Sequence, residues 1–396
     1  MMRVLYVQYT NPGAYPPLVR GARMLVESGA EVLMLGTRVR DTDALNIQSG
    51  NRMTVRLTDL PPEGWRLKAH YGRYAAWAAR EASVWKPDWI YASDLLSAPI
   101  ALALAALTRA RVVYHEHDAP AEAHPSWIIK RYLAARRRLL RGADLVVTPN
   151  AERSARLAAM AGGRPVFTVW NCPRRPLRRP PMRQSPDGLR VVYRGSVNPE
   201  RLPLIAIEAV AQARTPMTLD VAGYETVGSR GYLAALAGHA ERLGAGDRVR
   251  VLGTIPDDEL GAICEQCDVG LALMPMMAPD ENMRHMAGAS NKAFEYLSSG
   301  VTPLVSDLPD WRRTFADPGY ALVCDPSRVD SICEVLAWAA QHRSTVREMS
   351  LRGWERLGVD WNYESQFAPV LNAMWGRSFE PAMDSAGADV EAGCAS

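Results

Sequence analysis

The sequence predicts an α/β protein built from two doubly wound, Rossmann-like domains that face each other across a cleft. Its 396 residues exceed what one hydrophobic core usually supports, so two domains are expected. In both halves, short apolar segments alternate with amphipathic, helix-like segments, which is typical of parallel sheets covered by helices. A proline- and arginine-rich segment between the halves, residues 174–188, has no apolar periodicity and is expected to be a linker.

The composition is that of an ordinary globular protein. Hydrophobic residues make up 48% and charged residues 22%, and the mean hydropathy is -0.16. The net charge of +3 is too small to indicate a nucleic-acid partner. The chain opens directly with a strand-like segment and shows no secretory signal, and its longest apolar run, Ala98–Leu107, is too short to span a bilayer. We therefore expect a cytoplasmic protein.

The six cysteines do not indicate a disulfide framework or a metal centre. They are scattered along the chain, which fits reduced thiols. Cys264 and Cys267 form a CxxC pair, but no second pair follows, and a structural zinc site needs four ligands. We expect no metal there.

The first half opens with the strand, loop, helix and strand order of a doubly wound domain. Residues 2–8 read as a buried strand, Leu18–Glu27 as a helix and residues 31–36 as a second strand. The intervening loop carries Gly13, where backbone could approach a substrate closely, but it lacks the GxGxxG pattern of dinucleotide sites. A further strand ends near Asp94 and is followed by a helix.

The next strand carries histidines at its carboxyl end. Alternation along the strand places His115 and His117 on one face and Glu116 on the other, with Asp118 following. A histidine pair at this end of a strand can act as a general base or bind a sugar hydroxyl or phosphate. The alternative is a pair that is merely solvated or hydrogen-bonded within a loop. We favour a substrate contact for at least one of them, because ligands bind at this edge of such sheets.

Residues 126–141 predict a basic amphipathic helix. Ile128, Tyr132, Ala135 and Leu139 can share an apolar side, whereas the cationic residues are Lys130, Arg131 and Arg136 to Arg138. Such a helix can lie on an anionic membrane surface as a peripheral contact. We favour the alternative that it is a solvated helix covering the core, because packing on a sheet requires the same apolar stripe.

The second half repeats the alternation from Leu189 onward. The predicted divisions are an N-terminal domain (1–173), a linker (174–188), a C-terminal domain (189–358), a final helix (359–378) and a disordered tail (379–396).

The most informative stretch of the second half is Ser290–Pro303. Lys292 and Glu295 lie three residues apart, so both should face one side of a short helix that ends at Gly300, beside the mouth of a buried strand. Taken alone, the pair could be a surface ion pair. Arg201, expected in the first turn of another helix, offers a second cation. A diphosphate needs fixed cations and backbone amides, and a ribose needs a carboxylate, so these residues could bind a nucleotide without a metal.

With these residues in order, the chain resembles the GT-B fold glycosyltransferases, specifically the family 4 retaining enzymes. The resemblance extends over almost the whole chain. It rests on the order and spacing of segments such as VVYHEHD, GADLVVTPN, VVYRGSVNPERLPLIAIEA, CDVGLALMP and SNKAFEYLSSGVTPLVSD. It implies a nucleoside diphosphate-sugar donor on the C-terminal domain, an acceptor on the N-terminal domain, and a last helix that returns to the N-terminal domain.

The resemblance also implies roles for particular residues. Arg201 and Lys292 would bind the donor diphosphate, Glu295 the ribose, and His117 the donor sugar. The implied catalytic residues are thus His117, Arg201 and Lys292. The donor-binding residues are Gly13, Gly195, Ser196, Arg201, Asn291, Lys292 and Glu295.

Two positions depart from the family pattern. Ser196 stands where many members have an arginine. Ala287 stands eight residues before Glu295, where a glutamate usually contacts the transferred sugar, although Asp280 and Glu281 lie slightly upstream. These departures bear on the identity of the sugar more than on the type of reaction.

The expected function is therefore transfer of a sugar, with retention, from a nucleoside diphosphate-sugar to a hydroxyl or similar acceptor. A UDP-sugar is favoured because it is the commonest donor of the family, and neither a metal nor a cofactor is expected. The acceptor could be a small molecule, a saccharide or a lipid-linked sugar. The alternatives are a nucleotide-sugar 2-epimerase, which needs no acceptor, and a non-catalytic nucleotide-sugar-binding subunit, which Ala287 favours.

Overall fold

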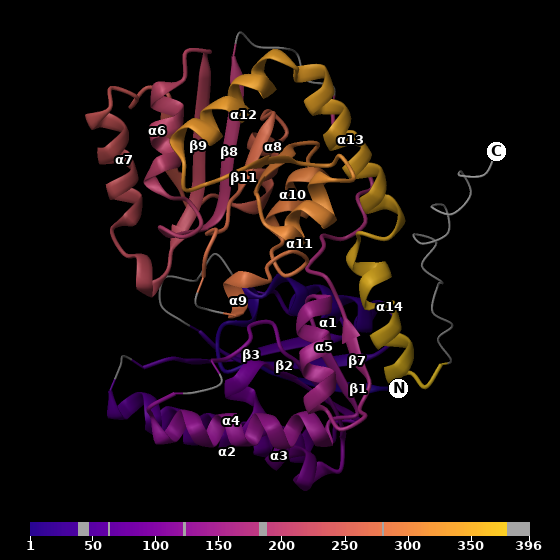
Figure 1. Cartoon of the computed structure of the whole chain (residues 1–396). Coiled ribbons are helices and arrows are strands. Elements are labelled where there is room, and N and C mark those ends of the chain that lie inside the picture. Colours follow the sequence, from indigo (N-terminus) through magenta and orange to yellow (C-terminus); the bar gives the residue numbers. More distant parts are fainter. Residues whose placement is uncertain (39–46, 62–63, 122–123, 182–187, 279–280, 378–396) are drawn as a thin grey trace, which may run out of the picture.

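Two parallel sheets, each covered by helices, form two domains stacked one above the other (Figure 1). The computed structural model describes residues 1–38, 47–61, 64–121, 124–181, 188–278 and 281–377. The predicted fold class is confirmed. The predicted disordered tail, residues 379–396, lies outside the described residues, as do residues 182–187 of the predicted linker.

The N-terminal sheet has the strand order β3-β2-β1-β4-β5-β6-β7, and neighbouring strands are parallel. Its alternating strands and helices are β1 (Arg3–Val7), η1 (Pro12–Ala14), α1 (Pro16–Glu27), β2 (Glu31–Arg38), β3 (Met53–Asp59), α2 (Trp65–Trp85), β4 (Trp89–Ser93), α3 (Asp94–Thr108), β5 (Arg111–His115), α4 (Trp127–Gly142), β6 (Leu145–Thr148), α5 (Ala151–Met160) and β7 (Val166–Thr168). The sequence did not predict β3, α2 and α5 separately.

The C-terminal sheet has the order β10-β9-β8-β11-β12-β13, again with parallel neighbours. Its elements are β8 (Leu189–Val197), α6 (Leu204–Gln212), β9 (Met217–Glu225), η3 (Val227–Ser229), α7 (Tyr232–Arg242), β10 (Val249–Gly253), α8 (Asp257–Cys264), β11 (Val269–Ala272), α9 (Glu281–Arg284), α10 (Lys292–Ser298), β12 (Thr302–Ser306), α11 (Pro309–Trp311), η4 (Arg312–Ala316), β13 (Leu322–Cys324), α12 (Val329–Gln341), α13 (Arg343–Val359) and α14 (Tyr363–Met374).

Helix α14 packs on the N-terminal domain although it follows the C-terminal one (Figure 1). Tyr363 and Phe367 are fully buried in the apolar cluster that includes β1 and α1. Gly21 of α1 lies against both rings, since a Cβ there would stand 3.3 Å from Phe367 and 3.4 Å from the Tyr363 hydroxyl. The last helix therefore joins the two domains by apolar packing.

The strand order reverses between β1 and β4 in the first sheet and between β8 and β11 in the second. In an open parallel sheet, the crevice at the carboxyl ends of the strands beside such a reversal is where ligands bind. Gly13 follows β1, Asp94 is the first residue of α3 after β4, Gly195 lies near the carboxyl end of β8, and the segment after β11 leads to Lys292. The topology therefore places Gly13, Gly195 and Lys292, all predicted site residues, beside the two switch points.

Candidate active site

The C-terminal side of the site is the carboxyl end of strand β8, which contains Gly195 and Ser196. Gly195 has φ +100°, a left-handed conformation that favours glycine. Gly223, its partner on β9, is required as well, because a Cβ there would stand 2.1 Å from the Gly195 carbonyl oxygen. A Cβ built on Gly195 would stand 3.7 Å from Nζ of Lys292. The backbone at Gly195 and the Lys292 ammonium are thus close enough to contact the same ligand.

Arg201 lies beside the carboxyl end of β8, in the loop that precedes α6. The prediction that it occupies the first turn of a helix was wrong, because α6 begins at Leu204 after Pro203. Proline disfavours helical backbone in the residue before it, so this loop cannot be continuous with the helix. The Arg201 guanidinium donates from Nη1 to the Ser196 hydroxyl at 2.9 Å. Its buried Nε has no hydrogen-bond acceptor among the described residues.

Lys292 is a buried cation at the start of α10. Its residue is only 6% exposed, and no described carboxylate forms an ion pair with its ammonium. Burial, together with the charges of Arg201 and Arg194, lowers the pKa of the Lys292 ammonium to about 7, although Glu295 acts in the opposite direction. An anion bound here would offset all three causes, since it would supply the missing counter-charge.

Glu295, one turn along α10, is already bound by cations from both domains. Its Oε1 accepts from Nη2 of Arg20 and from Nδ2 of Asn291, each at 2.9 Å, and its Oε2 lies 2.6 Å from Nη2 of Arg194. Burial acts to raise the pKa of Glu295, but Arg194 and Arg20 outweigh it and hold the pKa below its ordinary value. The sequence pointed to neither arginine. A ribose bound to the Glu295 carboxylate would share that carboxylate with Arg20 and Arg194.

Arg20 carries this contact across the domain boundary. It projects from α1 of the N-terminal domain and also donates from Nη1 to the carbonyl oxygen of Cys172 at 2.7 Å. Its side chain is 17% exposed and that of Glu295 is 9% exposed. A charge-assisted bond this well shielded from water stabilises the observed arrangement of the two domains.

The N-terminal side of the site is built around His117. Nδ1 of His115 shares a hydrogen bond with the Tyr91 hydroxyl at 2.7 Å, and the His115 and His117 rings lie with centroids 3.7 Å apart, tilted by 33°. Neither ring nitrogen of His117 has a hydrogen-bond partner among the described residues, although both are buried. Burial lowers the pKa of His117 to about 4 against the opposing effect of Asp118, so the imidazole is neutral near pH 7.

Asp94 supports this loop, and the sequence analysis did not place it in the site. It stands at the junction of β4 and α3 with φ +62°. Its Oδ1 accepts from the amides of His117 at 2.8 Å and Asp118 at 3.3 Å, whereas the buried Oδ2 has no partner among the described residues. Burial and the neighbouring Asp118 raise the pKa of Asp94 well above its usual range. Its position at a strand end beside the switch point was the signal that could have found it.

Gly13 is the predicted residue with the weakest support from geometry. It lies within η1, and its amide already donates to Oδ1 of Asn11 at 2.9 Å. Its backbone is not left-handed, so nothing in the local conformation requires glycine. Its place at the end of β1 leaves it near Tyr15, whose ring centroid is 5.4 Å from that of His117.

The segment that leads into α10 is clamped by the N-terminal domain. The buried Arg153 donates to the carbonyl oxygens of His117 at 2.8 Å, Asn282 at 3.0 Å and His285 at 3.2 Å. Asn171 donates its amide to the Gly288 carbonyl at 2.7 Å. Between these contacts, Ala287 lies 8% exposed in an apolar cluster. The buried carboxylate of Asp310 lies beside this position, where its Oδ2 accepts from the Ala287 amide at 3.4 Å.

Within the described part of the chain, no three His, Cys, Asp or Glu side chains are grouped closely enough to hold a metal ion. Cys264 and Cys267 are both buried in an apolar cluster of the C-terminal domain. A membrane-crossing helix is likewise not found among the described residues, since none is both long and apolar enough.

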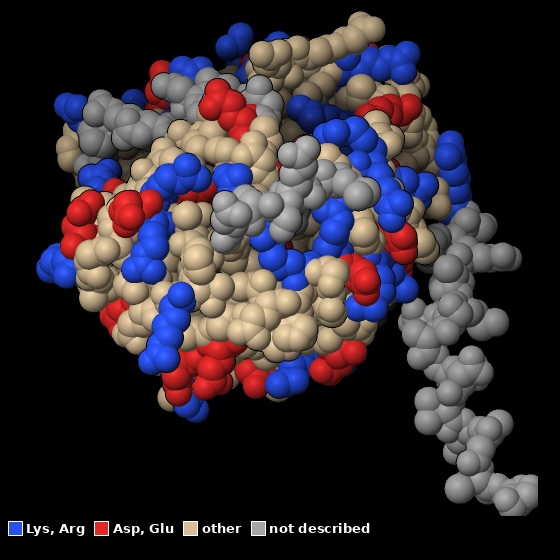
Figure 2. Space-filling view, turned by 90° about the horizontal axis from the view of Figure 1, so that it is seen from above, with Lys and Arg blue, Asp and Glu red and all other residues tan. Residues whose placement is uncertain are grey.

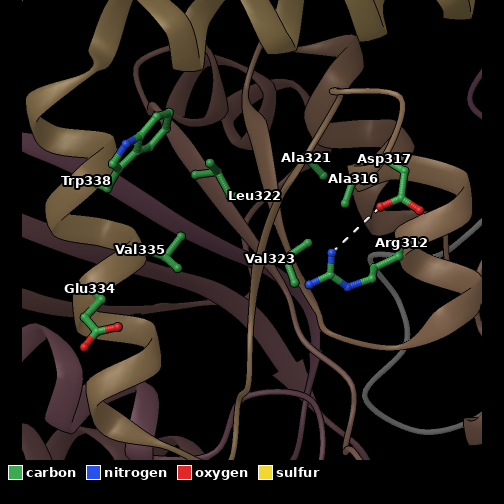
Figure 3. A pocket seen from close by; sticks show the side chains of 9 residues that line it. All are labelled: Arg312, Ala316, Asp317, Ala321, Leu322, Val323, Glu334, Val335 and Trp338. Atoms are coloured by element: carbon green, nitrogen blue, oxygen red, sulfur yellow. Dashed lines mark ion pairs between the residues drawn. The ribbon is translucent and has the colours of Figure 1, made fainter.

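A separate hollow of about 460 Å³ lies away from these residues, along the edge strand β13 between α12 and η4 (Figure 3). Its lining is mostly apolar, with Arg312 and Asp317 3.8 Å apart at one side. None of the residues predicted for the donor site lines it.

Comparison with known proteins shows what this chain resembles in sequence and in fold. Residues 18–172 match the family model of the glycosyl transferase 4-like domain. No curated protein sequence matches the chain significantly. Among solved structures, HepE from Anabaena in complex with UDP and glucose has a TM-score of 0.71 and 18% identity, with 95% of this chain and 100% of that chain covered.

Two further structures show the same fold. Sucrose-phosphate synthase from Thermosynechococcus elongatus has a TM-score of 0.75 at 14% identity, covering 96% of this chain and all of that one. A UDP-forming α,α-trehalose-phosphate synthase from Burkholderia xenovorans has a TM-score of 0.66 at 13% identity, with 94% of this chain and 100% of that chain covered. Residues 18–172 therefore match a glycosyl transferase 4-like domain, and nearly the whole chain has the two-domain GT-B fold of these structures.

Proposed function

We propose that the chain is a glycosyltransferase that acts in the cytoplasm and transfers a sugar with retention from a nucleoside diphosphate-sugar, UDP-sugar favoured, to an acceptor hydroxyl. The observation that carries the proposal is the group of cations around the carboxyl end of β8. Lys292 and Arg201 lie beside Gly195 and Ser196, and the nearby Glu295 is already paired with Arg194 and Arg20. The positive charge that remains suits a diphosphate.

The reaction follows from this placement. As the bond between the anomeric carbon and the diphosphate breaks and a bond to the acceptor oxygen forms, negative charge grows on the departing diphosphate. Fixed cations and amides aimed at that charge are the strongest catalytic contribution such a site can make. Arg201 and Lys292 would supply it from the C-terminal domain. His117, a neutral imidazole in the opposite domain, would bind a hydroxyl of the transferred sugar.

Arg201 and Lys292 would also neutralise the negative charge of the departing diphosphate, which a divalent cation neutralises in other transferases. We therefore propose that the reaction needs no metal. Adding a chelator should leave the rate unchanged. Full loss of turnover with EDTA and recovery with Mg²⁺ would contradict metal independence.

The choice of UDP rests on the resemblance and on HepE, which has been solved with UDP, UDP-glucose, and UDP and glucose. Arg201 and Lys292 bind phosphates common to every nucleoside diphosphate and carry no preference for the base. Retention likewise rests on the resemblance alone.

One observation favours a second candidate. Ala287 lies buried where a sugar-contacting glutamate would stand, so the chain could bind a nucleotide sugar without turning it over. Incubation of the protein with radiolabelled UDP-sugars and a panel of acceptors separates the candidates. Labelled acceptor of retained anomeric configuration supports the transferase. Epimerised sugar without acceptor indicates the epimerase, and tight binding without turnover indicates the binding subunit.

A further inference from the structure

Two tryptophans of the N-terminal domain stand exposed at the starts of neighbouring helices. Trp65, the first residue of α2, is 74% exposed, and Trp127, the first residue of α4, is 65% exposed. The chain has eleven tryptophans, and the next most exposed in the described part, Trp338, reaches only 39%. Removing a tryptophan side chain from water is strongly favourable, so two exposed tryptophans leave a large apolar area in contact with solvent.

The two tryptophans lie on the same side of the domain. Helices α2, α3 and α4 pack beside one another on one face of the sheet (Figure 1). Each leads from the carboxyl edge of the sheet back to the next parallel strand, so α2 and α4 run in the same direction. The two helices meet in their second turns, where the ring centroids of Tyr71 and Tyr132 lie 5.2 Å apart. At a rise of about 1.5 Å per residue, Trp65 and Trp127 each project roughly 7 to 9 Å beyond that contact.

Cationic side chains accompany both rings. The Arg66 guanidinium lies 5.9 Å from the Trp65 ring centroid, and that of Arg131 lies 5.2 Å from the Trp127 ring centroid. Helix α4 contains no Asp or Glu, and its exposed cations are Lys130, Arg131, Arg137, Arg138 and Arg141. Arg136, expected on the cationic side, is instead buried and donates to Glu116 from Nε at 2.5 Å and Nη2 at 2.7 Å.

Two described carboxylates of this domain are paired with arginines. Glu116 is neutralised by Arg136, and Asp59, at the end of β3, pairs with Arg38 at 3.3 Å. On the face of the C-terminal domain seen from above, by contrast, Lys and Arg side chains alternate with Asp and Glu (Figure 2). The first turns of α2 and α4 are therefore both aromatic and of one charge.

We propose that this surface, formed by Trp65, Arg66, Trp127, Lys130 and Arg131, docks on an anionic lipid bilayer. Tryptophan is enriched at the membrane–water interface, where its ring is apolar and its N–H remains hydrated. Lys and Arg beside it are attracted to anionic headgroups. A polyanion such as RNA would use the cations but would not need two rings projecting ahead of them. The inference concerns a surface and does not depend on the proposed transferase reaction.

The test is co-sedimentation of the full chain with vesicles of phosphatidylcholine alone or with a quarter phosphatidylglycerol. Wild-type protein should partition onto the anionic vesicles, weakly onto the neutral ones, and less at high salt. The Trp65→Ala/Trp127→Ala double variant should partition at least about tenfold less. Lys130→Glu/Arg131→Glu should also be released. The matched control Trp338→Ala, on the C-terminal domain, should bind as wild type does.

Quenching of tryptophan fluorescence by brominated lipids adds a reading independent of sedimentation. It should occur in wild type and in Trp338→Ala and be lost in the double variant. The substituted side chains are exposed, so melting temperatures should not change. Failure of wild-type protein to bind anionic vesicles, full binding by the double variant, or preferential binding of single-stranded RNA over the vesicles would each overturn the proposal.

Discussion

Lys292 shows how one buried side chain links the fold to ligand binding. Its ammonium is enclosed beside Arg194 and Arg201, and these surroundings lower its pKa to about 7. The free protein therefore holds this group close to half-protonated at neutral pH. A diphosphate favours the charged form, so binding should raise the pKa and take up a proton.

The first prediction concerns pH. Above pH 7, free Lys292 loses its proton, so the affinity for UDP should fall by up to about tenfold per unit as pH rises from 7.5 to 9. Titration calorimetry across this range measures it. Lys292→Arg is the control, because arginine stays charged and should remove most of the dependence. Equal pH dependence in both proteins would show that another group is responsible.

At the scale of elements, the site depends on the close pairing of β8 with β9. Gly195 adopts a left-handed conformation near the carboxyl end of β8, and Gly223 leaves room for its carbonyl oxygen. Strand ends this close hold the amides near Gly195 at fixed positions, which is what preorganised anion binding needs.

The second prediction follows from this pairing. Gly223→Ala would place a Cβ 2.1 Å from the Gly195 carbonyl oxygen and 2.6 Å from Cγ2 of Val197, so backbone must move. The free energy of unfolding should fall by about 2–4 kcal/mol, and UDP affinity should fall with it. Urea unfolding measures the first effect. Gly261→Ala is the matched control, since a Cβ there meets nothing within 4 Å and alanine favours helix α8.

At the scale of the whole molecule, contacts between the domains converge on the donor side. Arg20 reaches Glu295, and Arg153 holds the loop before α10 by its carbonyl oxygens. Because Glu295 lies beside the cations proposed for the donor, ligand binding and the relative position of the domains should influence each other.

The third prediction tests this coupling. Arg20→Met leaves Glu295 with Arg194 and Asn291 but removes its bond to the N-terminal domain. We expect roughly tenfold weaker UDP binding and a larger radius of gyration in solution scattering. Arg20→Lys should restore part of both. Arg23→Met, an exposed change on the same helix, is the control. An unchanged UDP affinity and an unchanged radius of gyration in Arg20→Met would show that the Arg20–Glu295 ion pair does not couple donor binding to the relative position of the domains.

The sequence predicted the fold class and those site residues that lie close together along the chain. Alternating apolar segments define parallel sheets, and the spacing of Lys292 and Glu295 places both on α10. The helical assignment of Arg201 failed because Pro203 delays the start of α6. Arg20 and Arg194 could not be predicted, because their contacts with Glu295 join residues 275 and 101 positions apart. Such pairings depend on tertiary packing that local patterns do not encode.

The most direct test of the account is calorimetric titration of UDP into wild-type protein, Arg201→Ala, Lys292→Ala and the exposed control Arg214→Ala at pH 7 without metal. The account predicts measurable binding by wild type and by Arg214→Ala. Each of the other two variants should lose about 1.5–3 kcal/mol of binding free energy, the range for a hydrogen bond to a charged group. Wild-type affinity in both Arg201→Ala and Lys292→Ala would contradict the assignment of this site to the donor diphosphate.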